Sequence, residues 1–209
     1  MQFHEGKTNR RVNSYLRLQI KINMKKTFLL FALAISITAF SQDRKSLLSA
    51  ALKNSNASDS SFVLRDSVVA HLYYDAESDS MLIADLKAQK IITATDADYM
   101  RAQLKNFKPH LWSADSISHS NIVSSSKTPA AGLSFKKSVK AWKDYFQLYK
   151  TGYYEVSEPV FSKDGNLAIV YVSFQCGSNC GNGGASVYKF EKGQWKPVKN
   201  CFSWEKQPN

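Results

Sequence analysis

The sequence predicts an α+β fold in which N-terminal helices pack on a C-terminal four-stranded antiparallel meander. Three observations predict this class. Apolar residues recur at helical spacing before residue 112 and again over residues 138–150, whereas from Tyr154 they follow the alternating pattern of strands. Two dipeptides typical of tight hairpin turns, Asp164-Gly165 and Lys192-Gly193, divide the strand-like region.

The helical part of the chain covers residues 43–112. Its first expected helix spans residues 43–54, where four apolar side chains recur at helical spacing: Leu47, Leu48, Ala51 and Leu52. Residues 61–74 fit either a strand or a helix, because their apolar runs are too short to separate the two periods.

A second helix is expected over residues 77–90, with three apolar side chains facing inward: Met81, Leu82 and Leu86. A third helix is expected to begin at Thr95, which would form a capping-box-like pair with Asp98, the shorter aspartate standing in for the usual glutamate. Pro109 ends this helical pattern, because proline disrupts the hydrogen bonds of a helix interior.

A serine-rich connection, residues 113–138, follows the helical part and lacks sustained periodicity. The apolar pair Ile122-Val123 indicates one short strand within it. A helix is then expected over residues 138–150, where an apolar stripe recurs at helical spacing: Val139, Trp142, Tyr145, Phe146 and Tyr149. Gly152 is the expected C-cap of this helix.

The expected meander covers residues 154–204. Its four strands are placed at residues 155–161, 167–174, 185–191 and 194–204. Pro159 in the first strand cannot donate to a strand ladder, so this strand should lie at an edge. The second strand is apolar on both faces, as expected of a central strand, and Pro197 indicates a bulge or an edge position in the last one.

The region before residue 42 has the pattern of a secretory signal peptide. Residues 24–41 comprise a methionine, two lysines, an apolar stretch of thirteen residues and a cleavage site that would leave Gln42 first. Thirteen residues rise only about 20 Å as a helix, so no stable membrane anchor is expected after cleavage. Residues 1–23 are interpreted as a spurious extension, and residues 42–209 as one domain, periplasmic or secreted, of a Gram-negative bacterium.

The formal net charge of +11 is unevenly distributed. Residues 1–42 contain seven Lys/Arg and one Asp/Glu, a net charge of +6, and the remaining residues contain 21 and 16, a net charge of +5. Beyond residue 42 the sequence has no run of five or six like charges. A nucleic-acid partner is therefore not expected, and the partner is taken to be an unidentified ligand or protein.

Three cysteines lie near the C-terminus. In an exported protein, Cys176 and Cys180 are expected to form a structural disulfide across a glycine-bearing loop, with pairing of either one to Cys201 as the variant. Redox catalysis is disfavoured because the spacing is not C-x-x-C, and zinc is disfavoured because a fourth ligand is missing. If Cys201 is the unpaired residue, its alternation with Phe202 and Trp204 predicts a partly buried, inert thiol.

Two acidic or glycine-rich stretches are interpreted as structural. Asp75, Glu77 and Asp79 alternate as in a calcium loop, but Ser80 stands where that loop needs glycine, so an exposed acidic turn before a helix is expected. Residues 181–184 could form an anion-binding nest, although a turn is the expected structure.

His71 is expected to be a hydrogen-bonded core residue rather than a general base. Six aromatic side chains are expected in the core rather than as a surface for stacking sugars: Trp142, Tyr145, Phe146, Tyr149, Tyr153 and Tyr154. We therefore predict no catalytic residue, no cofactor and no bound metal ion.

Three serines follow aspartate and precede an apolar residue, the pattern of an O-glycosylation site in some Gram-negative periplasms: Ser67, Ser80 and Ser116. About one such match is expected by composition, so three matches favour modification of at least one serine. Attachment of a glycan requires the serine to be exposed.

Several C-terminal motifs are similar to those of uncharacterised exported bacterial proteins, which have no assigned activity. The motifs are PVFSKDG (Pro159–Gly165), VYVS (Val170–Ser173), CGxxCGxG (Cys176–Gly183) and the closing pair Trp195-Lys196. The resemblance covers about fifty residues and implies a shared fold and export, with no mechanism.

The sequence thus favours an exported soluble binding or interaction protein without an identifiable catalytic centre. The alternative is a small extracytoplasmic enzyme, either thiol-based through Cys176 or Cys180 or a hydrolase. A cell-surface structural component is a third class.

Overall fold

A computed structural model describes residues 44–57, 62–73, 75–117, 120–130 and 132–206. The chain from Arg44 to Asn209 forms one compact unit. The expected extension (residues 1–23), signal peptide (residues 24–41) and cleavage site all lie outside the described residues.

The α+β class is confirmed, but the prediction of a four-stranded antiparallel meander is wrong. The described residues form a mixed seven-stranded sheet in the order β2-β1-β3-β5-β6-β7, with β4 paired to β5. The strands are β1 (Phe62–Arg65), β2 (Ser120–Val123), β3 (Tyr153–Val156), β4 (Val160–Phe161), β5 (Leu167–Gly177), β6 (Cys180–Glu191) and β7 (Gln194–Lys206). Strand β1 runs parallel to both β2 and β3, and such non-local pairing leaves no turn motif in the sequence.

The helices are residues 44–54, α2 (Ala76–Ala88), α3 (Ala94–Lys105) and α4 (Phe135–Tyr149), with a 3₁₀ turn η1 (Ser125–Lys127). Asp75 caps α2 by accepting a hydrogen bond from the Ser78 amide. The expected capping pair of α3 is wrong by two residues, because Thr93 and Asp96 form the reciprocal box. Helix α4 begins at Phe135, earlier than expected, and ends at Lys150 in the left-handed conformation (φ 60°), so Gly152 is not its cap.

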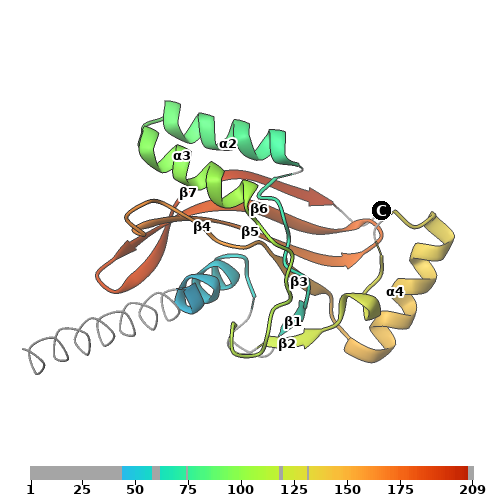
Figure 1. Cartoon of the computed structure of the whole chain (residues 1–209). Helices are drawn as coiled ribbons and strands as arrows, with labels where there is room; N and C mark the ends of the chain where they lie inside the picture. Colours follow the sequence, from blue (N-terminus) through green and yellow to red (C-terminus); the bar gives the residue numbers. More distant parts are fainter. Residues whose placement is uncertain (1–43, 58–61, 74, 118–119, 131, 207–209) are drawn as a thin grey trace, which may run out of the picture. The chain divides into compact units, whose positions relative to one another are not determined.

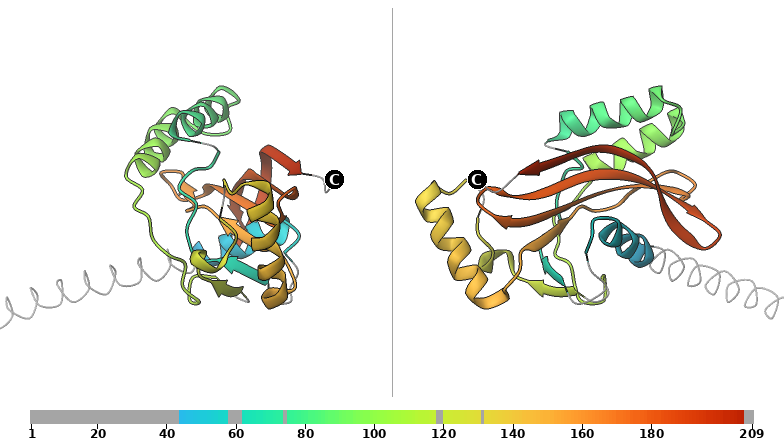
Figure 2. Two further views of the ribbon diagram at one scale, coloured as in Figure 1. Left: turned by 90° about the vertical axis from the view of Figure 1, so that its right-hand side faces the viewer. Right: turned by 180° about the vertical axis from the view of Figure 1, so that it is seen from behind.

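Helices cover both faces of the sheet (Figures 1 and 2). On one face, the leucines of residues 44–54 pack against Ala168, Val170 and Val172 of β5. On the other face, α2 and α3 pack against Ile169 of β5 and its neighbours. The alternation along β5 confirms the expected central strand, since each successive side chain enters the opposite core layer.

One expected inward residue of α2 faces solvent. Met81 is 58% exposed, whereas Ile83 is fully buried together with Leu86. The predicted inward face was therefore rotated, because the run Met81-Leu82-Ile83 allows more than one apolar stripe.

Helix α4 packs on the β1–β2–β3 side of the sheet through aromatic side chains. Trp142 and Tyr153 stack with ring centroids 5.5 Å apart and an interplanar angle of 7°, and Tyr145 meets both edge-on. Tyr154 points to the opposite face, against Phe174. The expected core role of these aromatic residues is confirmed, with Phe146 and Tyr149 partly buried at the margin.

Two strand positions test the expectations drawn from proline. The strand expected over residues 155–161 is divided at Pro159 into β3 and β4. Its expected edge position is wrong for β3, which lies between β1 and β5, but holds for β4, which among the described strands pairs only with β5. The prediction for Pro197 is confirmed, because β7 is an edge strand and its register against β6 shifts beside that residue. Both expected hairpin turns are present, with Gly165, Lys192 and Gly193 at positive φ.

Candidate functional site

The cysteine-rich segment forms the tip of the β5–β6 hairpin. Cys176 and Cys180 lie at disulfide distance, with Cα atoms 5.0 Å apart, and Cys201 is the free cysteine. The hairpin tip also contacts the first turn of α4, where the Ser138 and Ser178 hydroxyl oxygens are 2.7 Å apart. The favoured cysteine pair therefore fixes a hairpin end that borders another element.

The glycines that follow Cys180 belong to a strand and not to a loop. Gly181, Gly183 and Gly184 lie in β6 and pair with β5 on one side and β7 on the other. The expected turn is therefore wrong, and so is the anion-binding nest, because the ladders on both sides use the backbone groups that a nest would present.

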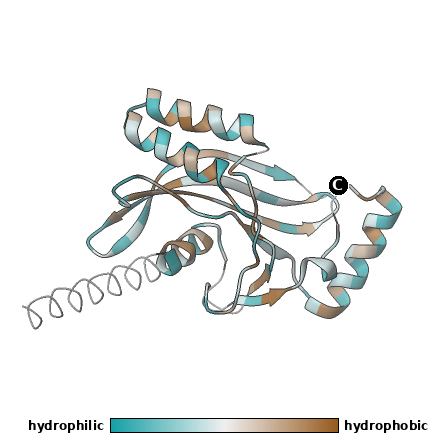
Figure 3. Cartoon of the chain, in the orientation of Figure 1, coloured by the Kyte–Doolittle hydropathy of each residue, from teal (hydrophilic) through white to brown (hydrophobic). Residues whose placement is uncertain are grey.

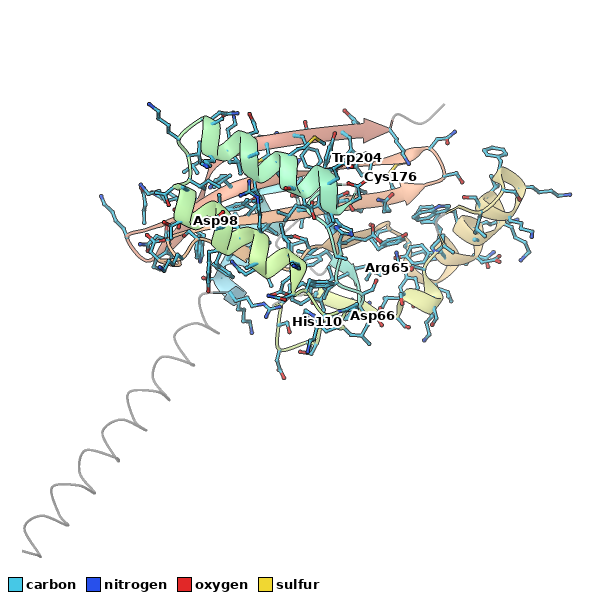
Figure 4. The ribbon with its side chains drawn as sticks, turned by 45° about the horizontal axis from the view of Figure 1, so that its top comes forward. Arg65, Asp66, Asp98, His110, Cys176 and Trp204 are labelled. Atoms are coloured by element: carbon cyan, nitrogen blue, oxygen red, sulfur yellow. A yellow bond between two sulfur atoms is a disulfide. The ribbon has the colours of Figure 1, made fainter. Side chains whose placement is uncertain are left out.

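A row of paired residues crosses the sheet from Trp204 to Arg65, both of which are labelled in Figure 4. Trp204, Gly183, Ser173 and Glu155 are successive partners on β7, β6, β5 and β3. Arg65 of β1 completes the row, with its Nη1 2.5 Å from Glu155 Oε1, and Ser173 Oγ donates to Glu155 Oε2. The polar end of the row is thus an ion pair and its other end is an indole ring.

A groove of about 290 Å³ opens at the indole end of this row. We call it the aromatic groove, and it is lined by Tyr73, Tyr171, Gln175, Phe202, Trp204, Glu205 and Lys206. The rings of Tyr73 and Phe202 lie 4.2 Å apart between centroids, and Trp204 Nε1 donates to the Tyr171 hydroxyl oxygen at 3.2 Å. Tyr73 remains 38% exposed, so this ring cluster reaches the surface.

The glycines of β6 determine how Trp204 lies in the groove. A Cβ at Gly183 would sit 3.0 Å from Trp204 Nε1, and one at Gly181 would sit 3.4 Å from Trp204 Cη2. The indole therefore lies across the bare backbone of two residues that carry no side chain. The Lys206 ammonium lies 5.6 Å from the ring centroid, within the range of a cation–π contact.

Asp79 holds the segment that carries Tyr73. Its carboxylate is 1% exposed and accepts hydrogen bonds from the amides of Leu72 and Tyr73 at 2.8 and 2.9 Å. His71 Nδ1 lies 3.0 Å from the second carboxylate oxygen. The expected hydrogen bond of His71 is confirmed, but its expected burial is wrong because the side chain is half exposed.

The acidic residues near α2 are therefore not one exposed turn. Asp75 and Glu77 are exposed. Hydrogen bonds from the amide and the side chain of Ser78 hold the pKa of the Asp75 carboxyl below the usual value. Asp79 is buried and faces the preceding backbone. Within the described part of the chain, no three histidine, cysteine or acidic side chains gather as a metal site would require.

The sheet carries a second, polar groove of about 510 Å³ near the end of the helix formed by residues 44–54. It is lined mainly by amides, hydroxyls and glycines: Asn54, Ser55, Asn56, Val172, Asn182, Gly183, Gly184, Ser186, Asn200, Phe202, Ser203, Trp204 and Glu205. Both grooves adjoin the same part of β7, around Phe202 and Trp204.

Cys201 is partly buried beneath α2 and α3. Burial raises the pKa of its thiol to about 11, which leaves about 0.1% thiolate at pH 8. The expectation of a partly buried, poorly reactive thiol agrees with this environment.

An ionic cluster joins residues 44–54 to the segment between β3 and β4. The Arg44 guanidinium contacts the Glu158 carboxylate, and His110 Nε2 lies 3.2 Å from the same carboxylate oxygen. Burial raises the pKa of Glu158, opposed by the charges of Arg44 and His110. The cluster fixes the position of a helix, and no local pattern in the sequence links its three residues.

The three candidate glycosylation serines differ in exposure. Ser80 is exposed on α2, whereas Ser67 and Ser116 are half-buried. Ser80 therefore meets the exposure requirement best, and modification stays a prediction.

Sequence reasoning did not identify the aromatic groove. Its residues come from three segments, around Tyr73, around Tyr171 and at Phe202–Lys206, and no spacing within one segment connects them. The available pattern was the alternation of Phe202 and Trp204 in the last strand, where Trp204 pairs with Gly183 and Phe202 pairs with Ala185 of β6. A large aromatic residue paired with a glycine on an edge strand indicates a ring that covers bare backbone.

Among the described helices, none combines the length and the apolarity needed to cross a bilayer. In comparisons with known proteins, the chain matches no family model, and no curated protein or solved structure is significantly similar to it.

Proposed function

We propose that this chain is an exported binding protein that holds a saccharide in the aromatic groove. The observation that carries the proposal is the groove itself, where four aromatic side chains linked by successive contacts meet a rim of amide, carboxylate and ammonium groups. Sugar rings present an apolar face of C–H groups and an edge of hydroxyls. Such a ligand matches a site in which ring faces and hydrogen-bonding groups lie side by side.

The size and the construction of the groove also favour this ligand class. A volume of about 290 Å³ holds one or two sugar rings, near the lower limit of small-molecule pockets. Trp204 is held by the glycine floor and by its hydrogen bond to Tyr171, so binding costs little side-chain entropy. Gln175, Glu205 and Lys206 supply donors and acceptors for hydroxyls.

Titration of tryptophan fluorescence with defined tetrasaccharides, among them β1,4-linked N-acetylglucosamine, β1,4-glucose and α1,4-glucose, tests the ligand class. At least one should bind with a Kd below about 1 mM. In calorimetric titrations, which do not need the indole as a reporter, Trp204→Ala should weaken this binding about tenfold because it removes the stacking surface, whereas Trp204→Phe should retain most of it.

The control variant is Val198→Ala, an exposed apolar residue on the same strand outside the groove. It should bind as the unaltered protein does. If no tetrasaccharide binds more tightly than about 1 mM, or if Trp204→Ala binds normally, the saccharide proposal is wrong.

Export is tested by intact mass of the protein purified from the exported fraction of its host. The chain should begin at Gln42, and at pH 8 its three cysteines should resist alkylation in the folded state. Unfolding without a reductant should expose one reactive thiol, that of Cys201, and unfolding with a reductant should expose all three.

Two outcomes of this mass measurement count against export. One is a chain that retains the leader, residues 24–41, and the other is the labelling of three thiols before reduction. A glycan on Ser80 would appear in the same spectrum as added mass on the peptide that contains this serine.

A further inference from the structure

Helix α4, together with its C-cap Lys150, carries most of the net charge of the chain beyond residue 42. Residues 43–209 contain 21 Lys/Arg and 16 Asp/Glu, a net charge of +5, and residues 135–150 alone contain five lysines and one aspartate, a net charge of +4. The rest of that region is therefore close to neutral. The basic residues themselves are spread over the sequence, but most of their excess over acidic residues lies in residues 135–150.

These lysines adjoin exposed apolar side chains. Trp142 and Tyr145 of α4 are buried against the sheet, whereas Phe135 and Val139, one helical turn apart, remain 69% and 48% exposed. Successive helix residues are about 100° apart, which places a stripe of exposed lysines directly beside these two residues: Lys136, Lys140 and Lys143. We call these five side chains the α4 surface, and Figure 3 shows the mixed hydropathy of the helix.

The structure holds this surface outward. The buried stripe of α4 packs through Trp142 and Tyr145 on Tyr153, and Ser138 contacts the β5–β6 hairpin at Ser178. The helix therefore cannot rotate to bury Phe135 without losing its aromatic contacts. Of the three lysines, Lys140 pairs with Asp144 at 2.8 Å, a solvent-exposed contact that leaves the positive charge of the stripe in excess.

We infer that the α4 surface binds reversibly to bilayers that contain anionic phospholipids. The lysines would lie against the lipid phosphates, while Phe135 and Val139 would enter the boundary between headgroups and acyl chains. The apolar pair favours a bilayer over a soluble polyanion, since exposed apolar side chains gain free energy only where they leave water. This inference is independent of the saccharide proposal, because the aromatic groove contains no residue of α4.

Sedimentation with vesicles tests the inference on the protein purified from its host. Binding to phosphatidylcholine vesicles with about 30% phosphatidylglycerol should exceed binding to pure phosphatidylcholine, and 0.5 M salt should weaken it. The triple variant Lys136→Gln/Lys140→Gln/Lys143→Gln should bind about 100-fold more weakly, on the basis of roughly tenfold or less per lysine. The double variant Phe135→Ser/Val139→Ser should bind at least about tenfold more weakly.

The matched control is Lys87→Gln/Lys105→Gln/Lys108→Gln, which removes the same charge from exposed sites outside α4. It should keep most of the binding, and circular dichroism should give the same fold for every variant. Equal loss in both triple variants would mean that only net charge matters, and the inference would be wrong. Failure of the unaltered protein to bind anionic vesicles would also overturn the inference. So would a Phe135→Ser/Val139→Ser variant that binds both vesicles and heparin, a soluble polyanion, as tightly as the unaltered protein does.

Discussion

Replacement of Gly152 with alanine is expected to lower the free energy of unfolding by about 4 kcal/mol, enough to unfold a marginal protein. A Cβ at this position would overlap the carbonyl oxygen of Gln175 and would lie 2.7 Å from the Phe174 ring. Gln175 is paired with Tyr153 in the β3–β5 ladder, so its carbonyl cannot move aside without breaking the sheet. Denaturant unfolding under non-reducing conditions measures the loss.

Gly165→Ala is the control for this variant. Gly165 lies in the β4–β5 turn at φ +73°, and no atom lies within 4 Å of the position its Cβ would take. The alanine would meet only the cost of a left-handed conformation, about 1–2 kcal/mol. An equal loss in the two variants would contradict the steric argument, because then close approach of the Gln175 carbonyl would add nothing.

Replacement of Asp79 with alanine is expected to cost about 3 kcal/mol of unfolding free energy. It would leave the amides of Leu72 and Tyr73 without their acceptor in a buried place, and each unsatisfied group carries a penalty of about 1–3 kcal/mol. Because this segment positions Tyr73, the same variant should also weaken saccharide binding. Thermal unfolding and the fluorescence titration measure the two effects.

Asp79→Asn tests which property of the carboxylate matters. Asparagine keeps one oxygen that can accept from the two amides, so it should lose less stability than alanine. If asparagine costs as much as alanine, the contact with His71 and the negative charge would be the stabilising features, and the explanation through the amides would be wrong.

The sequence predicted those parts of the fold that depend on local patterns. The helical leucines of residues 44–54, the two-sided apolar strand β5 and both hairpin turns follow from periodicity and turn chemistry. The capping box of α3 was misplaced because Thr93–Asp96 and Thr95–Asp98 have the same spacing. Thr93 is the N-cap, whereas Thr95 already lies within the first turn of the helix. Local patterns with two equal solutions cannot be resolved without tertiary contacts.

The missed features are all non-local. Strand β1 pairs with residues about 60 and 90 positions away: Phe62 pairs with Ser120, and Leu64 pairs with Tyr154. No turn motif in the sequence predicts pairs of such separation. Pro159 predicted an edge position for the strand expected over residues 155–161, but the break that contains this proline lies after β3. The aromatic groove depends on the same kind of assembly, since Tyr73 meets Phe202 only in the folded chain.

The parallel position of β1 also orders the folding of the chain in time. Strands β4 to β7 are joined by short turns and can associate through local hairpins. Strand β1 can pair only after its partners β2 (residues 120–123) and β3 (residues 153–156) have been brought beside it. Contacts of this sequence separation slow folding, because the intervening loop must close before any pairing is gained. In a polypeptide that emerges from its N-terminus, β1 is therefore among the first segments to appear and among the last to be paired.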